Sequence, residues 1–116
     1  MTVYRVAPVS GQFRLDLNSL TELSEQAGTA VLSVEGTDAP LLLVRYNSNL
    51  YYTLSAICTF SPCTVKEKGS RFVCPCHGCT YDRSGSVTKG PAEQPLRRYP
   101  TRLENNGRTL VIEYTA

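Results

Sequence analysis

The chain has 116 residues and a nearly balanced charge, with 12 basic and 10 acidic side chains and a formal net charge of +2. This length predicts one domain over residues 1–116, and the lack of any block of like charge excludes an electrostatic footprint for nucleic acid. No stretch reaches the roughly 18 apolar residues of a membrane span, and the first residues lack the apolar segment of a signal peptide. We therefore expect a soluble, cytoplasmic protein.

Short runs with a period of two dominate the first half of the chain. Phe13, Leu15 and Leu17 alternate with polar residues, which predicts a strand with one apolar face. The polar segment 18–28 predicts a loop or a single helical turn. Three β-rich runs follow, separated by turn sequences, and predict a meander: residues 30–34, 41–46 and 50–54.

The last third of the chain continues the β pattern. Pro100 cannot donate a ladder hydrogen bond, so it places residues 96–103 at a sheet edge or a bend. Asn105-Asn106-Gly107 predicts a type I′ turn that joins residues 101–103 to 109–114, because Asn and Gly tolerate positive φ angles. No run predicts a helix of ten or more residues. The predicted fold class is all-β.

All five cysteines and the only histidine lie in one stretch, residues 58–81, with the sequence CTFSPCTVKEKGSRFVCPCHGCTY. This density indicates a covalent or metal-centred role. The chain has no glycine-rich phosphate loop and no nucleophile-base pair, which argues against a hydrolase or a transferase.

The second half of this stretch, Cys74-Pro75-Cys76-His77-Gly78 with Tyr81 and Asp82 after it, resembles the second cluster-binding box of Rieske iron-sulfur proteins. The resemblance covers roughly residues 28–114 and includes Gly90-Pro91-Ala92. It implies an antiparallel β sandwich with a small two-loop cluster-binding subdomain at about residues 56–92, clamped by the Gly-Pro-Ala segment.

The family match also implies a ligand set for a 2Fe-2S cluster. Cys58 and Cys74 match the two thiolate ligands, and His77 matches one of the two imidazoles. The family's first box is Cys-Thr-His-x-Gly-Cys, and Phe60 stands here at its histidine position. Two further cysteines match the disulfide that ties the two loops together in the respiratory-complex branch: Cys63 and Cys76.

Cys79 stands where the family usually has a serine that hydrogen-bonds a bridging sulfide. Our hypothesis is that Cys79 supplies the thiolate that replaces the missing imidazole, giving three cysteine ligands and one histidine. An added thiolate charge lowers the reduction potential toward the low end of the Rieske range, about −150 to +300 mV. Tyr81 matches the family tyrosine whose hydroxyl bonds a ligand sulfur and opposes this fall in part.

Two alternatives stand beside the cluster. Phe60 packs over an empty site in a cluster-free structural or interaction subunit, or some cysteines and His77 hold zinc, which accepts tetrahedral sulfur-nitrogen ligation. With a cluster, the expected function is one-electron transfer between donor and acceptor proteins, as a soluble carrier or within a larger oxidoreductase complex. The implied disulfide favours an oxidising compartment, against the cytoplasmic expectation above.

Overall fold

The computed structural model describes residues 3–20, 28–37, 39–47 and 49–114. These residues form strands in three sheets and one 3-10 turn, with no α-helix among them, which confirms the all-β prediction. The elements are β1 (Val3–Val6), β2 (Gln12–Asp16), η1 (Leu17–Ser19), β3 (Thr29–Val34), β4 (Leu41–Arg45), β5 (Tyr51–Ser55), β6 (Lys66–Lys68), β7 (Arg71–Val73), β8 (Thr80–Tyr81), β9 (Val87–Lys89), β10 (Arg98–Tyr99), β11 (Thr101–Glu104) and β12 (Thr109–Glu113).

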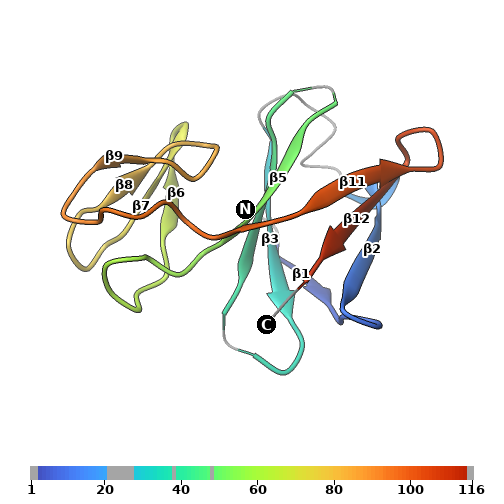
Figure 1. The fold of residues 1–116 in the computed structure, drawn as a ribbon, viewed down its shortest axis with the longest axis horizontal. Helices are drawn as coiled ribbons and strands as arrows, with labels where there is room; N and C mark the ends of the chain where they lie inside the picture. The colour runs from blue at the N-terminus through green and yellow to red at the C-terminus, as the bar shows by residue number, and fades with distance from the viewer. Residues whose placement is uncertain (1–2, 21–27, 38, 48, 115–116) are drawn as a thin grey trace.

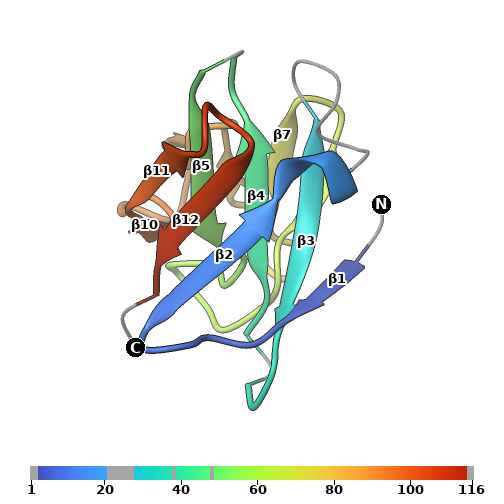
Figure 2. The ribbon, with the colours of Figure 1, turned by 90° about the vertical axis from the view of Figure 1, so that its right-hand side faces the viewer.

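The three sheets form three layers. A five-stranded sheet in the order β1-β3-β4-β5-β10 lies between a three-stranded sheet, β11-β12-β2, and a four-stranded sheet, β6-β7-β8-β9 (Figure 1). Viewed from the side, β2 and β12 lie in front of β4 and β5, as expected for a sandwich (Figure 2). We call the five-stranded and three-stranded sheets together the base, and residues 56–92, which carry the four-stranded sheet, the small lobe.

The predicted meander is confirmed. β3 pairs antiparallel with β4, and β4 pairs antiparallel with β5. One strand pair departs from the antiparallel expectation, because β1 runs parallel to β3 with Val3 opposite Val31. The alternating sequence of β1 is short, and its partner lies far along the chain.

Strand β4 is buried on both faces. Successive side chains of a strand point to opposite sides, so Leu41 and Leu43 enter the core between the two base sheets, whereas Leu42 and Val44 enter a second core shared with the small lobe. This explains the unbroken apolar run LLLV, which is typical of a strand covered on both sides. The small lobe therefore packs against the base through apolar side chains.

The two C-terminal turn predictions hold. Pro100 separates β10, at the edge of the five-stranded sheet, from β11, at the edge of the three-stranded sheet, so the chain bends there from one layer to the other. Asn105 and Asn106 have φ angles of 53° and 57°, and the Gly107 N–H donates to the Glu104 carbonyl at 3.2 Å. Positive φ at both central residues fits the predicted type I′ turn, within a hairpin loop of residues 105–108.

The polar segment 18–28 lies mostly outside the described residues. Its start falls in η1, where the Asp16 carboxylate accepts a hydrogen bond from the Asn18 N–H at 3.0 Å, as a capping side chain does. Across the residues that the structure describes, no helix has the length and apolar character needed to cross a membrane.

Candidate cluster-binding site

Two loops of the small lobe carry the predicted site residues except Tyr81, which lies in β8 directly after the second loop. The first loop contains Cys58 and Cys63, and it closes on itself through a hydrogen bond from the Cys58 N–H to the Cys63 carbonyl, at 2.9 Å. The second connects β7 to β8, and there the Cys74 N–H donates to the Cys79 carbonyl at 2.8 Å. Gly78, with φ of 74°, supplies the left-handed turn in this loop.

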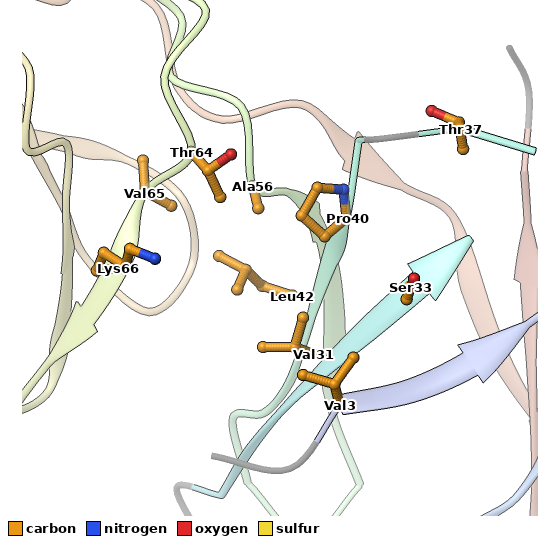
Figure 3. Close-up of a pocket in the computed structure, with 10 residues that line it drawn as sticks. All are labelled: Val3, Val31, Ser33, Thr37, Pro40, Leu42, Ala56, Thr64, Val65 and Lys66. Atoms are coloured by element: carbon orange, nitrogen blue, oxygen red, sulfur yellow. The ribbon is translucent and has the colours of Figure 1, made fainter. Parts of the chain in front are cut away.

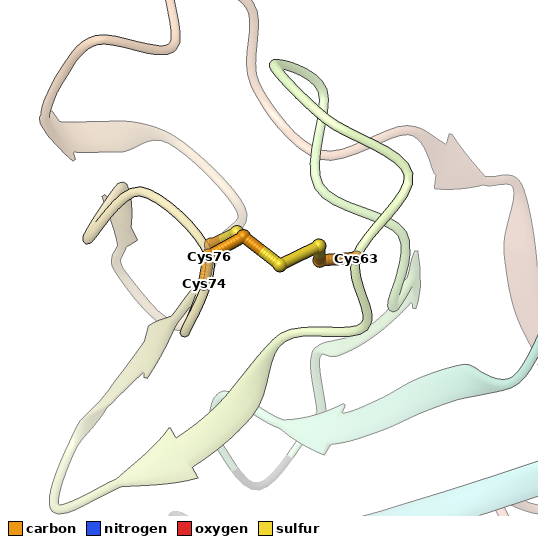
Figure 4. Close-up of side chains that lie close together, drawn as sticks. All are labelled: Cys63, Cys74 and Cys76. Carbon is orange, nitrogen blue, oxygen red and sulfur yellow. A yellow bond between two sulfur atoms is a disulfide. The ribbon is translucent and has the colours of Figure 1, made fainter.

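The predicted disulfide is confirmed. Cys63 and Cys76 are bonded, with their Cα atoms 6.4 Å apart (Figure 4). This separation lies in the usual range for a disulfide. The bond joins the two loops directly, so the position of one loop fixes the position of the other.

The three remaining cysteines are free, and all are buried. They belong to the core of the small lobe together with Phe72 and Tyr81. The Cys58 thiol interacts with the thiols of Cys74 and Cys79, so the first loop and the second loop bring their free sulfur atoms together. The backbone of Ala92, in the Gly-Pro-Ala segment, also hydrogen-bonds the Cys79 sulfur.

Tyr81 is fully buried, and its hydroxyl lies at the centre of a hydrogen-bond network. The hydroxyl oxygen is 3.2 Å from the Cys58 sulfur, 3.1 Å from the Thr59 backbone nitrogen and 3.0 Å from the Thr59 hydroxyl. The Thr59 hydroxyl in turn donates to the Gln94 carbonyl at 2.6 Å. The contact with a cysteine sulfur is the one that the family resemblance implies for Tyr81.

Two polar residues of the first loop were not singled out by the sequence. Thr59 holds the Tyr81 hydroxyl, and the Ser61 hydroxyl lies 3.7 Å from the Cys74 sulfur. Their signal was weak, since Ser and Thr are common in any loop. Their position between two cysteines of the first box was the sole indication of a contact with sulfur.

The surroundings of Cys58 and Cys79 shift the pKa values of their thiols in opposite directions. Burial opposes ionisation of Cys58, but hydrogen bonds from Tyr81, from two backbone groups of the same loop and from Cys74 outweigh it and lower the pKa to about 6. For Cys79, burial raises the pKa, and the neighbouring Cys58 and Cys74 sulfurs raise it further. In the metal-free protein Cys58 therefore loses its proton more readily than Cys79 does.

Phe60 and His77 lie at the solvent-exposed end of the two loops. Their rings meet edge to face, with centroids 5.0 Å apart and an interplanar angle of 78°. Phe60 is 50% exposed. Phe60 thus does not fill the interior, and it shields one side of the His77 imidazole.

A hollow separate from the site lies between the small lobe and the base. Its volume is about 490 Å³, and its mostly apolar lining contains no cysteine or histidine (Figure 3). It is lined by Val3, Val31, Ser33, Thr37, Pro40, Leu42, Ala56, Thr64, Val65 and Lys66. The sulfur-rich site is thus a packed region of the small lobe, separate from this hollow.

Comparison with known proteins identifies this arrangement. The model of the Rieske [2Fe-2S] domain matches residues 16–100, which include both loops. The chain belongs to the Rieske family. It is 47% identical over 62 residues to a cytochrome b6-f complex iron-sulfur subunit 1 of Cyanophora paradoxa, a match that covers 51% of this chain and 26% of that protein. This chain thus spans only about a quarter of that relative's length.

Solved structures agree with the assignment. The plasma membrane Rieske protein PetC3 of Synechocystis PCC 6803 aligns with a TM-score of 0.57 and 26% identity, over 88% of this chain and 85% of that one. The soluble domain of Rieske protein II from Sulfolobus acidocaldarius aligns with a TM-score of 0.63 over 89% of this chain and 81% of that one, at 16% identity. The second match supports the fold alone.

The donor set fits a binuclear centre better than a single ion. A 2Fe-2S cluster takes two ligands on each iron, so its four donors need not meet at one point. Among the described residues, the sulfur atoms that crowd within 4.8 Å of one another are those of Cys63, Cys74 and Cys76. Two of these form the disulfide and offer no thiolate, so this group cannot serve as a zinc site while the bond is intact.

Proposed function

We propose that this Rieske domain transfers single electrons through a 2Fe-2S cluster held by Cys58, Cys74, His77 and Cys79. The observation that carries the proposal is the meeting of three buried, free thiols from the two loops of the small lobe. Packing alone gives little reason for three unpaired thiols at one place in a core. The match to the Rieske [2Fe-2S] domain supports the same cofactor.

The surrounding residues suit thiolate ligands. The Tyr81 hydroxyl and the Ser61 hydroxyl are within reach of the Cys58 and Cys74 sulfurs, where each can stabilise negative charge. The disulfide holds the two loops at a fixed separation, and the buried aromatic side chains of Phe72 and Tyr81 keep water away. When bound, the cluster would accept and release one electron. The protein's part is to fix the four ligands and to set the charge around them.

The proposed ligand set predicts a low potential. A thiolate at Cys79, in place of a neutral imidazole, adds one negative charge and so disfavours reduction. We expect a value below about +150 mV, toward or below the lower end of the Rieske range. Phe60 has no hydrogen-bonding group, so we also expect the isolated protein to show no direct reduction by quinol.

Electron transfer through a cluster requires partner proteins that donate and accept the electron. The relatives are subunits of the cytochrome b6-f complex, which supports a place for this chain beside other redox proteins or subunits. His77 is exposed at the end of the loops, where a donor or acceptor protein can approach. We place the exchange of electrons at this end.

The test is reconstitution without air, using iron and sulfide. We expect two irons and two sulfides per chain, with the absorption and electron paramagnetic resonance spectra of a reducible binuclear cluster. Cys79→Ser protein should lose the cluster or change its spectrum, while Thr80→Ser, a change at the neighbouring residue outside the ligand set, should not. An unchanged spectrum in the Cys79 variant would contradict the ligand assignment.

The second candidate function is that of a cluster-free structural subunit. The observation in its favour is Phe60, which stands at an expected ligand position and offers no donor atom. Protein that binds no iron under the conditions above, yet folds with the intact disulfide, would favour this function over electron transfer.

A further inference from the structure

The sulfur atom of Cys74 lies within 4.8 Å of both sulfur atoms of the Cys63–Cys76 disulfide (Figure 4). Cys74 is a free cysteine, so a nucleophile stands beside a bond that thiolates attack. All three residues sit on the two loops that the disulfide ties together. We call this group the sulfur triad.

We propose that the sulfur triad is a centre for intramolecular thiol-disulfide exchange in the metal-free protein. The Cys74 thiolate attacks the Cys63 sulfur, so that a Cys63–Cys74 bond forms and the Cys63–Cys76 bond breaks. The electron pair of the broken bond goes to the Cys76 sulfur, which takes up the proton lost by Cys74. No external oxidant or reductant is required, because one disulfide replaces another.

The chain favours attack at Cys63 over attack at Cys76. Attack at Cys63 gives a disulfide that still joins the two loops, with the new partner two residues from the old one. Native pairing has a sequence separation of 13, and the new pairing has nearly the same span, so the constraint on the unfolded chain hardly changes. Attack at Cys76 would instead link two residues of one tight loop and release the first loop from the second.

The exchange changes which thiol is exposed. Cys58, Cys74 and Cys79 are buried, whereas Cys76 is exposed. In the native pairing every free thiol is therefore protected from solvent, and after exchange the freed Cys76 thiol faces it. The two pairings differ in reactivity toward a reagent that labels thiols in the folded protein.

The exchange also competes with the proposed function, on which this consequence rests. A Cys74 sulfur tied to Cys63 cannot bind iron, so the exchanged form is unable to hold the cluster. Conversely, a Cys74 sulfur bound to iron is unavailable for attack. Metal occupancy and the exchanged Cys63–Cys74 pairing are therefore mutually exclusive, whereas the native Cys63–Cys76 pairing is compatible with bound metal.

The experiment uses the metal-free, unreduced 116-residue chain, which is incubated with N-ethylmaleimide in its folded state. Labelling at Cys76 traps each exchanged molecule, so we expect one maleimide per chain in the intact mass, with fragmentation placing it on Cys76 and showing a Cys63–Cys74 bond. Cys74→Ser protein should gain at least tenfold less label at Cys76. Cys79→Ser protein keeps the sulfur triad and should be labelled there at the parent rate.

Several results would overturn the proposal. These are an unlabelled Cys76 in the parent protein, equal labelling in the Cys74 variant, or label on Cys63, which would mean that Cys76 is the sulfur attacked. The Cys63–Cys74 linkage is sought in the parent protein itself, so the test does not depend on the folding of a variant. Protein reconstituted with iron should lose the labelling. If it labels without metal but never binds iron, the exchange stands and the proposed function fails.

Discussion

The base and the small lobe are held together by different means. The core of the base contains aliphatic and aromatic side chains such as Leu32, Leu43 and Ile112, which come from strands of five or six residues. The small lobe has strands of two or three residues, and its core contains three free cysteines and Tyr81. The base is stabilised by strand pairing and by burial of apolar side chains. The small lobe is stabilised in addition by a disulfide and by side-chain hydrogen bonds. A short-stranded sheet can therefore carry a sulfur-rich site when a longer sheet supports it.

Strand β4 contributes side chains to both cores, so substitutions in it should distinguish the base from the small lobe and have the largest expected effect. Leu43→Ala, in the base core, should lower the free energy of unfolding by about 3 kcal/mol, within the usual 2–5 kcal/mol for a buried leucine. Leu42→Ala should cost a similar amount, but it should also speed amide hydrogen exchange at Phe72 and Tyr81 relative to Leu110. Identical exchange profiles in the two variants would show that the two cores unfold as one.

Removing the disulfide should weaken the lobe in particular. In the chain-entropy model a closed loop of this size is worth about 3 kcal/mol, so the Cys63→Ala/Cys76→Ala double variant should lose up to that amount. Because the bond lies wholly in the lobe, we expect hydrogen exchange to rise in β7 and β8 first. Equal acceleration in β3 and β12 would contradict a local role.

Asp82 fixes the turn after β8 and gives a test that depends on pH. One carboxylate oxygen accepts hydrogen bonds from the Ser84 N–H at 2.9 Å, the Ser84 hydroxyl at 2.7 Å and the Ser86 N–H at 3.0 Å. Burial opposes ionisation, but these bonds outweigh it and lower the pKa of Asp82 below its ordinary value of 3.8. Asp82→Ala should cost about 1 kcal/mol at neutral pH, because it removes hydrogen bonds in a partly buried turn.

The sign of the pH dependence follows from the lowered pKa. A carboxyl that is more acidic when folded stabilises the protein fully above its unfolded pKa, and this contribution disappears as the pH falls through the lower folded value. The difference in unfolding free energy between wild type and Asp82→Ala should therefore shrink below about pH 4. Asp82→Asn keeps an acceptor oxygen and should lose less stability. A difference that grows on acidification would refute this account.

The smallest expected effect concerns Tyr81, which belongs to the lobe alone. Tyr81→Phe removes the hydroxyl that lies 3.2 Å from the Cys58 sulfur and keeps the ring. In the reconstituted protein, loss of a hydrogen bond worth about 1 kcal/mol should lower the potential by about 40 mV, since tenfold in a one-electron equilibrium is 59 mV. Tyr99→Phe, in the base core, is the matched control and should leave the potential unchanged. Voltammetry of both variants checks this.

Local signals explain what the sequence predicted well. The meander, the bend at Pro100 and the Asn105-Asn106-Gly107 turn each depend on a few consecutive residues whose backbone preferences agree with the fold. The disulfide between Cys63 and Cys76 was found through family resemblance, which supplies a pairing that spacing alone cannot.

What the sequence did not predict depends on distant contacts. The parallel pairing of β1 with β3 joins segments far apart in the chain. Strand β6, Lys66–Lys68, consists of exposed charged residues and has no apolar pattern to detect. The contacts of Thr59 with Tyr81, and of Phe60 with His77, join the first loop to the second, so only the folded lobe reveals them. The ligand roles of Cys58, Cys74, His77 and Cys79 remain predictions.

The double-sided burial of β4 has a consequence for how the chain finds its fold. A strand with one polar face resists a shift of one residue, because the shift would bury polar groups. In β4 such a slip would only exchange Leu41 and Leu43 with Leu42 and Val44, side chains of similar size and polarity. Hydrophobicity alone therefore barely distinguishes the correct alignment from its neighbours. The register of β4 must therefore be set by its pairing with β3 and β5 and by the connecting turns. We expect β4 to reach its native register only after these two strands have formed, or together with them.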